Sequence, residues 1–252
     1  MPALDAVFAL VQERTGFPVV VTSSPEQATH VSMRAATKEF PVHSVLLNPK
    51  YQDSANYLIA IQCAGILFKW ADPRGIWDFV ENREKADFLR AKIAKKTERK
   101  GIPPENATRF ADANVSGLLQ QLASMPLEIL SLQWFHSTFP ELRGEQELYV
   151  SGYLREISAV MNPKIREMCP PEIYEKSVAM NAAFTLAWCA LAGSDVALIP
   201  YEAVGSLNLG RELSAALEGI KPFGPDSYVG AVDAWGAKLD MAEWYTWQLR
   251  TR

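Results

Sequence analysis

The stretch that decides the fold is His43–Leu67, HSVLLNPKYQDSANYLIAIQCAGIL. It opens with β-prone residues, which are interrupted by the turn-forming pair Asn48-Pro49. From Tyr57 onward, apolar residues occupy nearly every position of the helical repeat. This order predicts a strand, a turn and then a largely buried helix over residues 54–70.

The residues before this stretch extend the pattern toward the N-terminus. Ala3, Val7, Leu10 and Val11 share one face of a helix, and Thr15–Pro18 (Thr-Gly-Phe-Pro) ends it. Short β-prone runs follow at residues 19–21, 30–33 and 42–48. We therefore expect a small N-terminal sheet that packs on helices.

The residues after Leu67 are expected to be almost wholly helical. Gly101–Asn106 is the clearest linker, and predicted helices lie on both sides of it: residues 76–100, 114–123, 127–139, 145–160, 171–192, 207–217 and 229–249. Residues 196–199 fit either a short strand or a loop. The sequence predicts a predominantly helical α+β protein, with an α+β domain over residues 1–100 and a mainly helical domain over residues 107–252.

Composition narrows the class of protein. The chain has 252 residues, of which 48% are hydrophobic, and its formal net charge is −4. This balance is ordinary for a soluble domain and creates no global attraction to nucleic acid. The most apolar run, residues 178–192, is shorter than the roughly 20 residues of a membrane span. With no recognisable signal peptide and three widely spaced cysteines, we expect a cytoplasmic protein.

The segment Ile59–Leu67, IAIQCAGIL, resembles the helix IAHELGHIL of zincin-like metallopeptidases of the ImmA/IrrE kind. In that family two His at i and i+4 bind zinc, and the intervening Glu is the general base. In this chain the ligand positions are Ile61 and Gly65, and the general-base position is Gln62. The resemblance spans about residues 1–100 and implies a metallopeptidase-like scaffold without its metal ligands. An unrelated buried helix after an Asn-Pro turn is the alternative interpretation.

The function expected from this resemblance is binding without catalysis. We predict a non-enzymatic interaction or regulatory protein that binds a protein partner, with no catalytic residues, no metal and no cofactor. The predicted contact residues are Ile61, Gln62 and Gly65, together with Lys92, Lys95 and Lys96. These lysines belong to residues 83–100, which carry a local charge of +5. Nucleic acid is a secondary possibility for the partner, and a membrane is not expected.

Three alternatives assign chemistry to other residues. The first is a hydrolase that uses Cys63 with His43, or with His30, as the base. The second is a metal site built from His30 and His43 with Glu84; the resemblance implies a carboxylate ligand on the following helix, where Glu81 or Glu84 stands. The third is a small-ligand sensor lined by the apolar helix over residues 178–192 and by the C-terminal aromatic residues Trp235, Trp244, Tyr245 and Trp247.

Overall fold

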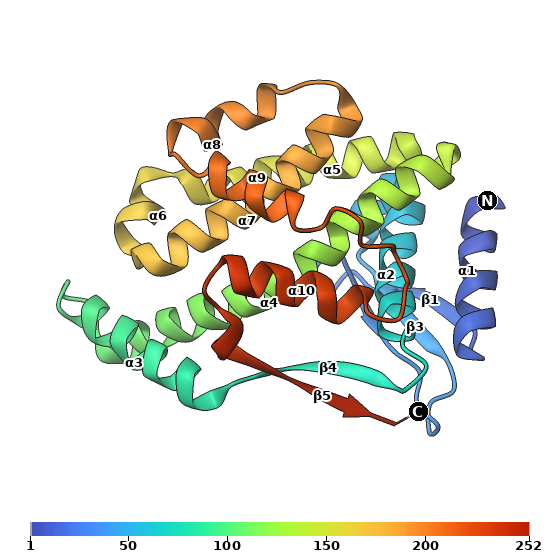
Figure 1. Cartoon of the computed structure of the whole chain (residues 1–252), viewed down its shortest axis with the longest axis horizontal. Coiled ribbons are helices and arrows are strands. Elements are labelled where there is room, and N and C mark those ends of the chain that lie inside the picture. Colours follow the sequence, from blue (N-terminus) through green and yellow to red (C-terminus); the bar gives the residue numbers. More distant parts are fainter. Residues whose placement is uncertain (1, 252) are drawn as a thin grey trace.

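A computed structural model describes residues 2–251 and confirms a predominantly helical α+β fold (Figure 1). The N-terminal part contains α1 (Pro2–Thr15), β1 (Val19–Ser23), β2 (Val31–Arg34), β3 (His43–Leu47), α2 (Ala55–Lys69), β4 (Ile76–Glu81) and α3 (Arg83–Glu98). The rest contains α4 (Pro104–Thr138), α5 (Arg143–Ser158), α6 (Pro163–Met168), α7 (Pro171–Ala192), α8 (Ile199–Ala203), α9 (Leu207–Ala215), α10 (Ser227–Lys238) and β5 (Tyr245–Arg250).

The predicted N-terminal sheet is present, with the strand order β1-β3-β2. The central strand β3 runs parallel to β1, with Val19 opposite His43, and antiparallel to β2, with Val31 opposite Leu47. Alternate residues of β3 are buried, as expected of a strand whose one face packs on helices. That face contacts α2.

The Asn48-Pro49 turn leads the chain from β3 into α2 through a short 3-10 helix, Pro49–Ser54. The Asn48 side chain accepts a hydrogen bond from the amide of Lys50 and donates one to the carbonyl of Gln27. The carboxylate of Glu145 on α5 accepts hydrogen bonds from the side chain of Asn56 and the amide of Tyr57. Glu145 therefore satisfies a backbone donor in the first turn of α2, a role that short polar residues usually play locally.

The segment predicted as one helix over residues 76–100 is instead a strand followed by a helix. Residues 76–81 form β4, which pairs antiparallel with β5, and α3 begins only at Arg83. Ile76, Phe79 and Val80 match helical spacing by chance, and the partner strand lies far away in sequence. Because local periodicity carries no signal from a distant partner, the prediction was wrong over these residues.

The predicted C-terminal helix over residues 229–249 is wrong for the same reason. Helix α10 ends at Lys238, and Asp240 takes a positive φ of 53°. The chain then reverses into β5, where Tyr245 pairs with Glu81 and Trp247 pairs with Phe79. The stacked rings of Phe79 and Tyr245, with centroids 4.6 Å apart, stabilise this ribbon.

The helices predicted at residues 114–123 and 127–139 are one helix, α4. Pro126 lies inside it rather than in the first turn of a new helix, and is buried against its neighbours. Proline removes one backbone hydrogen bond but is tolerated where packing compensates. In Figure 1, α4 crosses the middle of the molecule, and it packs against α2, α3, α5, α7 and α10. Residues 196–198 form a 3-10 turn and Ile199 begins α8, so this segment is helical and is neither the strand nor the loop that the sequence left open.

One large cluster of buried side chains joins the two parts of the chain. It includes Val45 and Phe68 from the N-terminal part and Leu122, Phe184 and Trp235 from the helical part. Of the predicted linker Gly101–Asn106, only residues 101–103 lie between the helices, because α4 begins at Pro104, and α3 and α4 pack along each other. Residues on both sides of this linker therefore share a core.

Candidate functional site

Helix α2 exposes only one strip of its surface to open space. Ile61, Gln62, Gly65 and Lys69 are half-buried, whereas the other residues from Leu58 to Trp70 are buried. The strip includes the three positions that the resemblance places at the zinc ligands and the general base. It faces α4, and all four residues line a groove of about 260 Å³ that also includes Ser124 and Glu128. We call this the α2 groove.

Two further hollows adjoin the α2 groove. The tyrosine cavity, of about 70 Å³ and closed on most sides, is lined by Val31, Tyr57, Leu58, Ile61, Gln62, Glu128, Tyr149, Tyr153 and Phe184. The polar groove, of about 390 Å³, lies between α4, α5 and α7 and is lined by Gln120, Gln121, Ser124, Glu128, Tyr153, Glu156 and Asn181 among others. Glu128 lines all three hollows, and we call them together the Glu128 site.

Glu128 is the unusual residue of this site. Among residues 2–251 no Lys, Arg or His forms an ion pair with its carboxylate. Burial raises the pKa of Glu128, and a hydrogen bond from Ser124, one turn earlier on α4, opposes this increase only in part. The Glu128 side chain is half-buried. Partial loss of water without a cationic partner is costly for a carboxylate, and such groups concentrate at functional sites.

Tyrosine side chains surround this carboxylate. Burial raises the pKa of Tyr57, Tyr149 and Tyr153, and the nearby charge of Glu128 raises all three further. Tyr149 and Tyr153 are one turn apart on α5, and their rings stack with centroids 5.8 Å apart. The amide nitrogen of Gln146 donates hydrogen bonds to the Tyr57 hydroxyl and to the carbonyl of Leu132, and so fixes the position of Tyr57.

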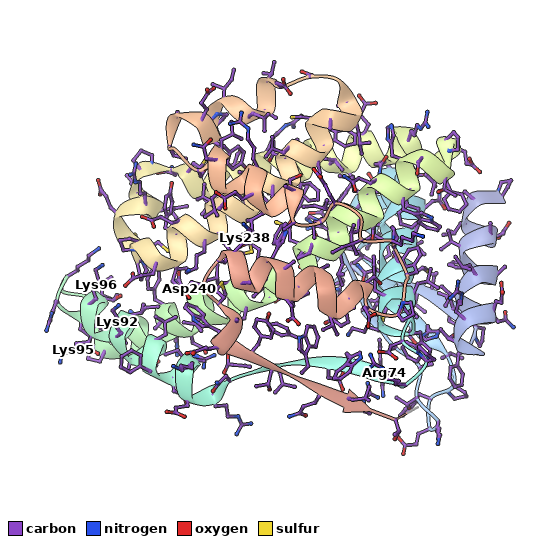
Figure 2. The ribbon with its side chains drawn as sticks, viewed as in Figure 1. Arg74, Lys92, Lys95, Lys96, Lys238 and Asp240 are labelled. Carbon is purple, nitrogen blue, oxygen red and sulfur yellow. The ribbon has the colours of Figure 1, made fainter. Side chains whose placement is uncertain are left out.

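The predicted lysines lie elsewhere. Figure 2 shows Lys92, Lys95 and Lys96 at one end of the long axis, on α3, whereas α2 lies toward the other end. Lys92 forms an ion pair with Glu172 on α7 at 2.7 Å, and this ion pair connects α3 to α7. The structure therefore brings Ile61, Gln62 and Gly65 together but does not bring the lysines to them.

The Cys63–His43 pair predicted for the hydrolase alternative is not formed. Cys63 is fully buried, and burial raises its pKa to about 12, which disfavours the thiolate. His43 is also fully buried: its Nδ1 accepts from the amide of Ala36, and its Nε2 lies 2.9 Å from the hydroxyl of Thr15. Because both ring nitrogens are engaged, neither can take a proton from Cys63.

The residues do not fit the metal sites considered for this chain. The sheet register places His30 beyond the end of β3 opposite to His43, roughly 16 Å away at about 3.3 Å per residue. Glu81 is paired with Arg90 at 2.7 Å, and Glu84 lies in the first turn of α3. Within residues 2–251 no group of three His, Cys, Asp or Glu side chains could hold a metal ion.

The C-terminal aromatic residues make contacts that stabilise the fold, and they do not surround a ligand cavity. Trp235 is fully buried, and its indole donates to the carbonyl of Leu213. The side chains of Tyr245 and Trp247 both donate to the same oxygen of Asp233, at 2.8 Å. The hollows of the Glu128 site contain none of these tryptophans.

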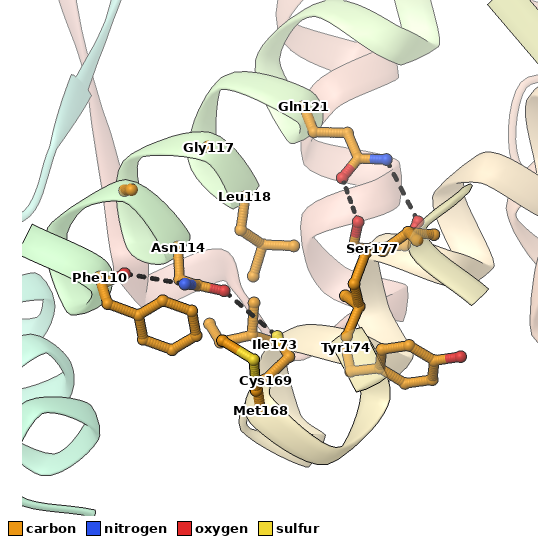
Figure 3. Close-up of a pocket in the computed structure, with 13 residues that line it drawn as sticks. Phe110, Asn114, Gly117, Leu118, Gln121, Met168, Cys169, Ile173, Tyr174 and Ser177 are labelled. Carbon is orange, nitrogen blue, oxygen red and sulfur yellow. Dashed lines mark hydrogen bonds between the residues drawn. The ribbon is translucent and has the colours of Figure 1, made fainter. Parts of the chain in front are cut away.

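A separate apolar cavity of about 380 Å³ lies between α4, α6 and α7. Figure 3 shows that its polar groups bond to one another: the Cys169 thiol donates to Asn114, and the Ser177 hydroxyl donates to Gln121. Burial raises the pKa of Cys169 to about 11. Tyr174 also lines this cavity, and its hydroxyl is buried without a hydrogen-bond partner among the described residues.

Glu128 is the functional candidate that the sequence analysis missed. One signal was present: it is a single acidic residue within the apolar run Met125–Leu132. An acidic residue in such a run lies either on the exposed face of the helix or inside the protein, where a functional role would explain its burial. Helix periodicity alone does not distinguish these two cases.

Within residues 2–251 no helix has both the length and the apolar character needed to cross a bilayer. Searches against protein-family models, curated proteins and solved structures found no match for this chain.

Proposed function

We propose that this chain is a non-enzymatic recognition protein that binds a protein partner at the Glu128 site. The observation that carries the proposal is a convergence: Ile61, Gln62 and Gly65 open onto hollows that also contain the carboxylate of Glu128, which has no ion-pair partner among the described residues. Ligand sites on proteins combine a concave surface with a few polar groups that fix orientation, and anchoring side chains of a protein partner fill pockets of this kind. The Glu128 site has both features.

The chemistry of the α2 strip favours binding over catalysis at these positions. The amide of Gln62 donates and accepts hydrogen bonds but does not take up a proton at neutral pH, and Ile61 and Gly65 carry no reactive atoms. Gly65 leaves the groove open, because a Cβ atom there would meet only the methyl group of Met33, at 4.0 Å. A side chain from a partner therefore has room beside the Gln62 amide.

Lys92, Lys95 and Lys96 are proposed as a second, separate contact surface. All three are exposed. A partner that touched both surfaces would have to extend along the long axis of the molecule (Figure 2).

Photocrosslinking tests the proposal. A benzophenone amino acid replaces Lys69, at the rim of the α2 groove, and in a matched control it replaces the exposed Asn208 on α9. We expect a defined partner that crosslinks from position 69 and not from position 208. Excess wild-type protein should suppress this crosslink, whereas the variant Gly65→Trp, whose side chain fills the groove, should not.

The proposal is overturned if both positions capture the same proteins, if position 69 captures none, or if Gly65→Trp competes as well as the wild type. Gln62→Ala serves as a second competitor in case Gly65→Trp does not fold. Circular dichroism of each competitor confirms that it is folded before use.

A further inference from the structure

We propose that Glu128 and the tyrosine cavity bind an alkylammonium group, either a primary amine or an N-methylated one. The group would be the end of a lysine side chain or a free small amine. This inference deepens the proposed function and rests on it for the location of the site. Three features carry it: the charge of the residues that line the site, the aromatic side chains among them, and the size of the tyrosine cavity.

The charge of the lining favours a cation. Neither the tyrosine cavity nor the polar groove is lined by Lys or Arg, and Glu128 belongs to both, whereas Lys69 lines only the adjoining α2 groove. The polar groove also contains Glu156, whose carboxylate lies 3.5 Å from His30. An anion entering here would meet uncompensated carboxylate charge, whereas a monocation would give Glu128 the partner that it lacks.

The aromatic lining favours an ammonium over a hydrated metal ion. Tyr57, Tyr149, Tyr153 and Phe184 all line the tyrosine cavity. Aromatic rings attract ammonium groups through their quadrupole, most strongly where water is excluded, and cages of this kind recognise methylated ammonium. Divalent cations instead require several oxygen ligands, and Glu128 is the one carboxylate that lines this cavity.

The size of the cavity matches a small cationic head group. Its volume is about 70 Å³, against the roughly 10–15 Å³ that one water needs on the same measure. Gln62, at the edge of the cavity, supplies an amide oxygen that can accept an N–H bond. The adjoining α2 groove has space for the alkyl chain that would carry the ammonium, lined in part by Ile61 and Leu127.

Isothermal titration calorimetry with matched ligand pairs tests the inference. The ligands are methylammonium against methanol, trimethylammonium against tert-butanol, and N-acetyl-lysine methylamide against N-acetyl-norleucine methylamide. We expect the charged member of a pair to bind and its neutral counterpart to bind at least tenfold more weakly. Tighter binding of the lysine amide identifies a protein side chain as the source, and tighter binding of the simple ammoniums identifies a free amine.

Two variants connect this binding to Glu128. Glu128→Gln keeps the shape of the side chain and removes its charge, and we expect it to weaken binding of the charged ligand roughly tenfold or more. Glu147→Gln removes an exposed charge on the neighbouring helix α5, and its affinity should equal that of the wild type. Equal affinity of wild type and Glu128→Gln overturns the inference, as do equal binding of charged and neutral ligands and no binding at millimolar concentrations.

The two proposals fail in different ways. If the partner crosslinked from position 69 binds Glu128→Gln as tightly as the wild type, the recognition function stands and the ammonium inference falls. If charged ligands bind through Glu128 but no partner crosslinks from position 69, the ammonium site stands and the protein-binding function falls.

Discussion

His43 shows how one buried side chain can make the stability of the whole protein depend on pH. It is fully buried between α1, the sheet and Trp70, with a ring distance of 5.1 Å to that indole. Burial lowers its pKa from 6.5 to about 4, so the folded protein holds His43 in its neutral form. Its ring nitrogens make structural hydrogen bonds, which is the ordinary role of a buried histidine.

The direction of this pH effect follows from linkage. Between pH 6.5 and 4 the unfolded chain binds a proton at His43 that the folded protein does not, so stability is lost as the pH falls. From pH 7 to pH 5 we expect this residue to account for a loss of about 2 kcal/mol in the free energy of unfolding. Urea denaturation at both pH values, for wild type and His43→Gln, measures it. Identical pH dependence in the two proteins would contradict the expectation.

Glu128 is expected to cost stability at neutral pH, as functional residues often do. Its pKa is raised by burial, so ionisation is penalised in the folded state, although a hydrogen bond from Ser124 opposes this increase. The titratable groups that share its hollows are Tyr57, Tyr149, Tyr153, Tyr228, Glu156 and Lys69. We predict that Glu128→Gln increases the free energy of unfolding by about 1–2 kcal/mol at pH 7. The gain should shrink as the pH falls toward 4, because the folded wild type then takes up its proton.

Glu147→Gln is the control for this measurement. Because Glu147 is exposed, its substitution should change stability by less than about 0.5 kcal/mol. A loss of stability in Glu128→Gln at pH 7 would show that the carboxylate has a stabilising partner in the folded protein.

At the scale of elements, α2 and α7 were predicted well and β4 and β5 were not. Helix α7 runs over Pro171–Ala192, the residues predicted, because its apolar periodicity is long and its ends carry proline and glycine. The strands β4 and β5 are each six residues long and pair only with one another. Neither strand has a local signal strong enough to reveal a partner so distant in the sequence.

The contact between α7 and α9 depends on a glycine. A Cβ atom on Gly210 would lie 2.7 Å from the Cβ of Ala182, which is too close for any real contact. We predict that Gly210→Ala forces these helices apart and destabilises the protein by about 1–3 kcal/mol. Thermal unfolding by circular dichroism measures the change.

Gly230→Ala provides the matched comparison within α10. A Cβ atom there meets nothing within 4 Å, so the variant should be neutral or more stable by up to about 1 kcal/mol, since alanine favours helix. Equal effects of the two substitutions would show that helix propensity, and not the close approach of α9 to α7, determines the result.

At the scale of the whole molecule, the core couples parts of the chain that are far apart in sequence. β4 pairs with β5, α3 packs on α4, and one buried cluster contains residues from both sides of the predicted linker. We predict that the full chain unfolds in a single transition, with coincident near-UV and far-UV circular dichroism signals. Distinct midpoints for the two signals would indicate separately folding parts.

A fragment of residues 1–100 tests the same point directly. It lacks β5 and α4, so Phe79 and the buried face of α3 would be exposed to water. We expect no cooperative urea transition from this fragment. A sharp transition would show that the N-terminal part folds independently, as a domain over residues 1–100 would require.

By itself the sequence determined the fold class, the N-terminal sheet and α2. These features are local, because they depend on residue identity and on periodicities of two or about 3.6 residues. Only the tertiary structure decided that Glu128 meets the α2 strip and the tyrosines of α5, and that β4 meets β5. The residues in these contacts come from separate elements, and packing of the whole chain brings them together.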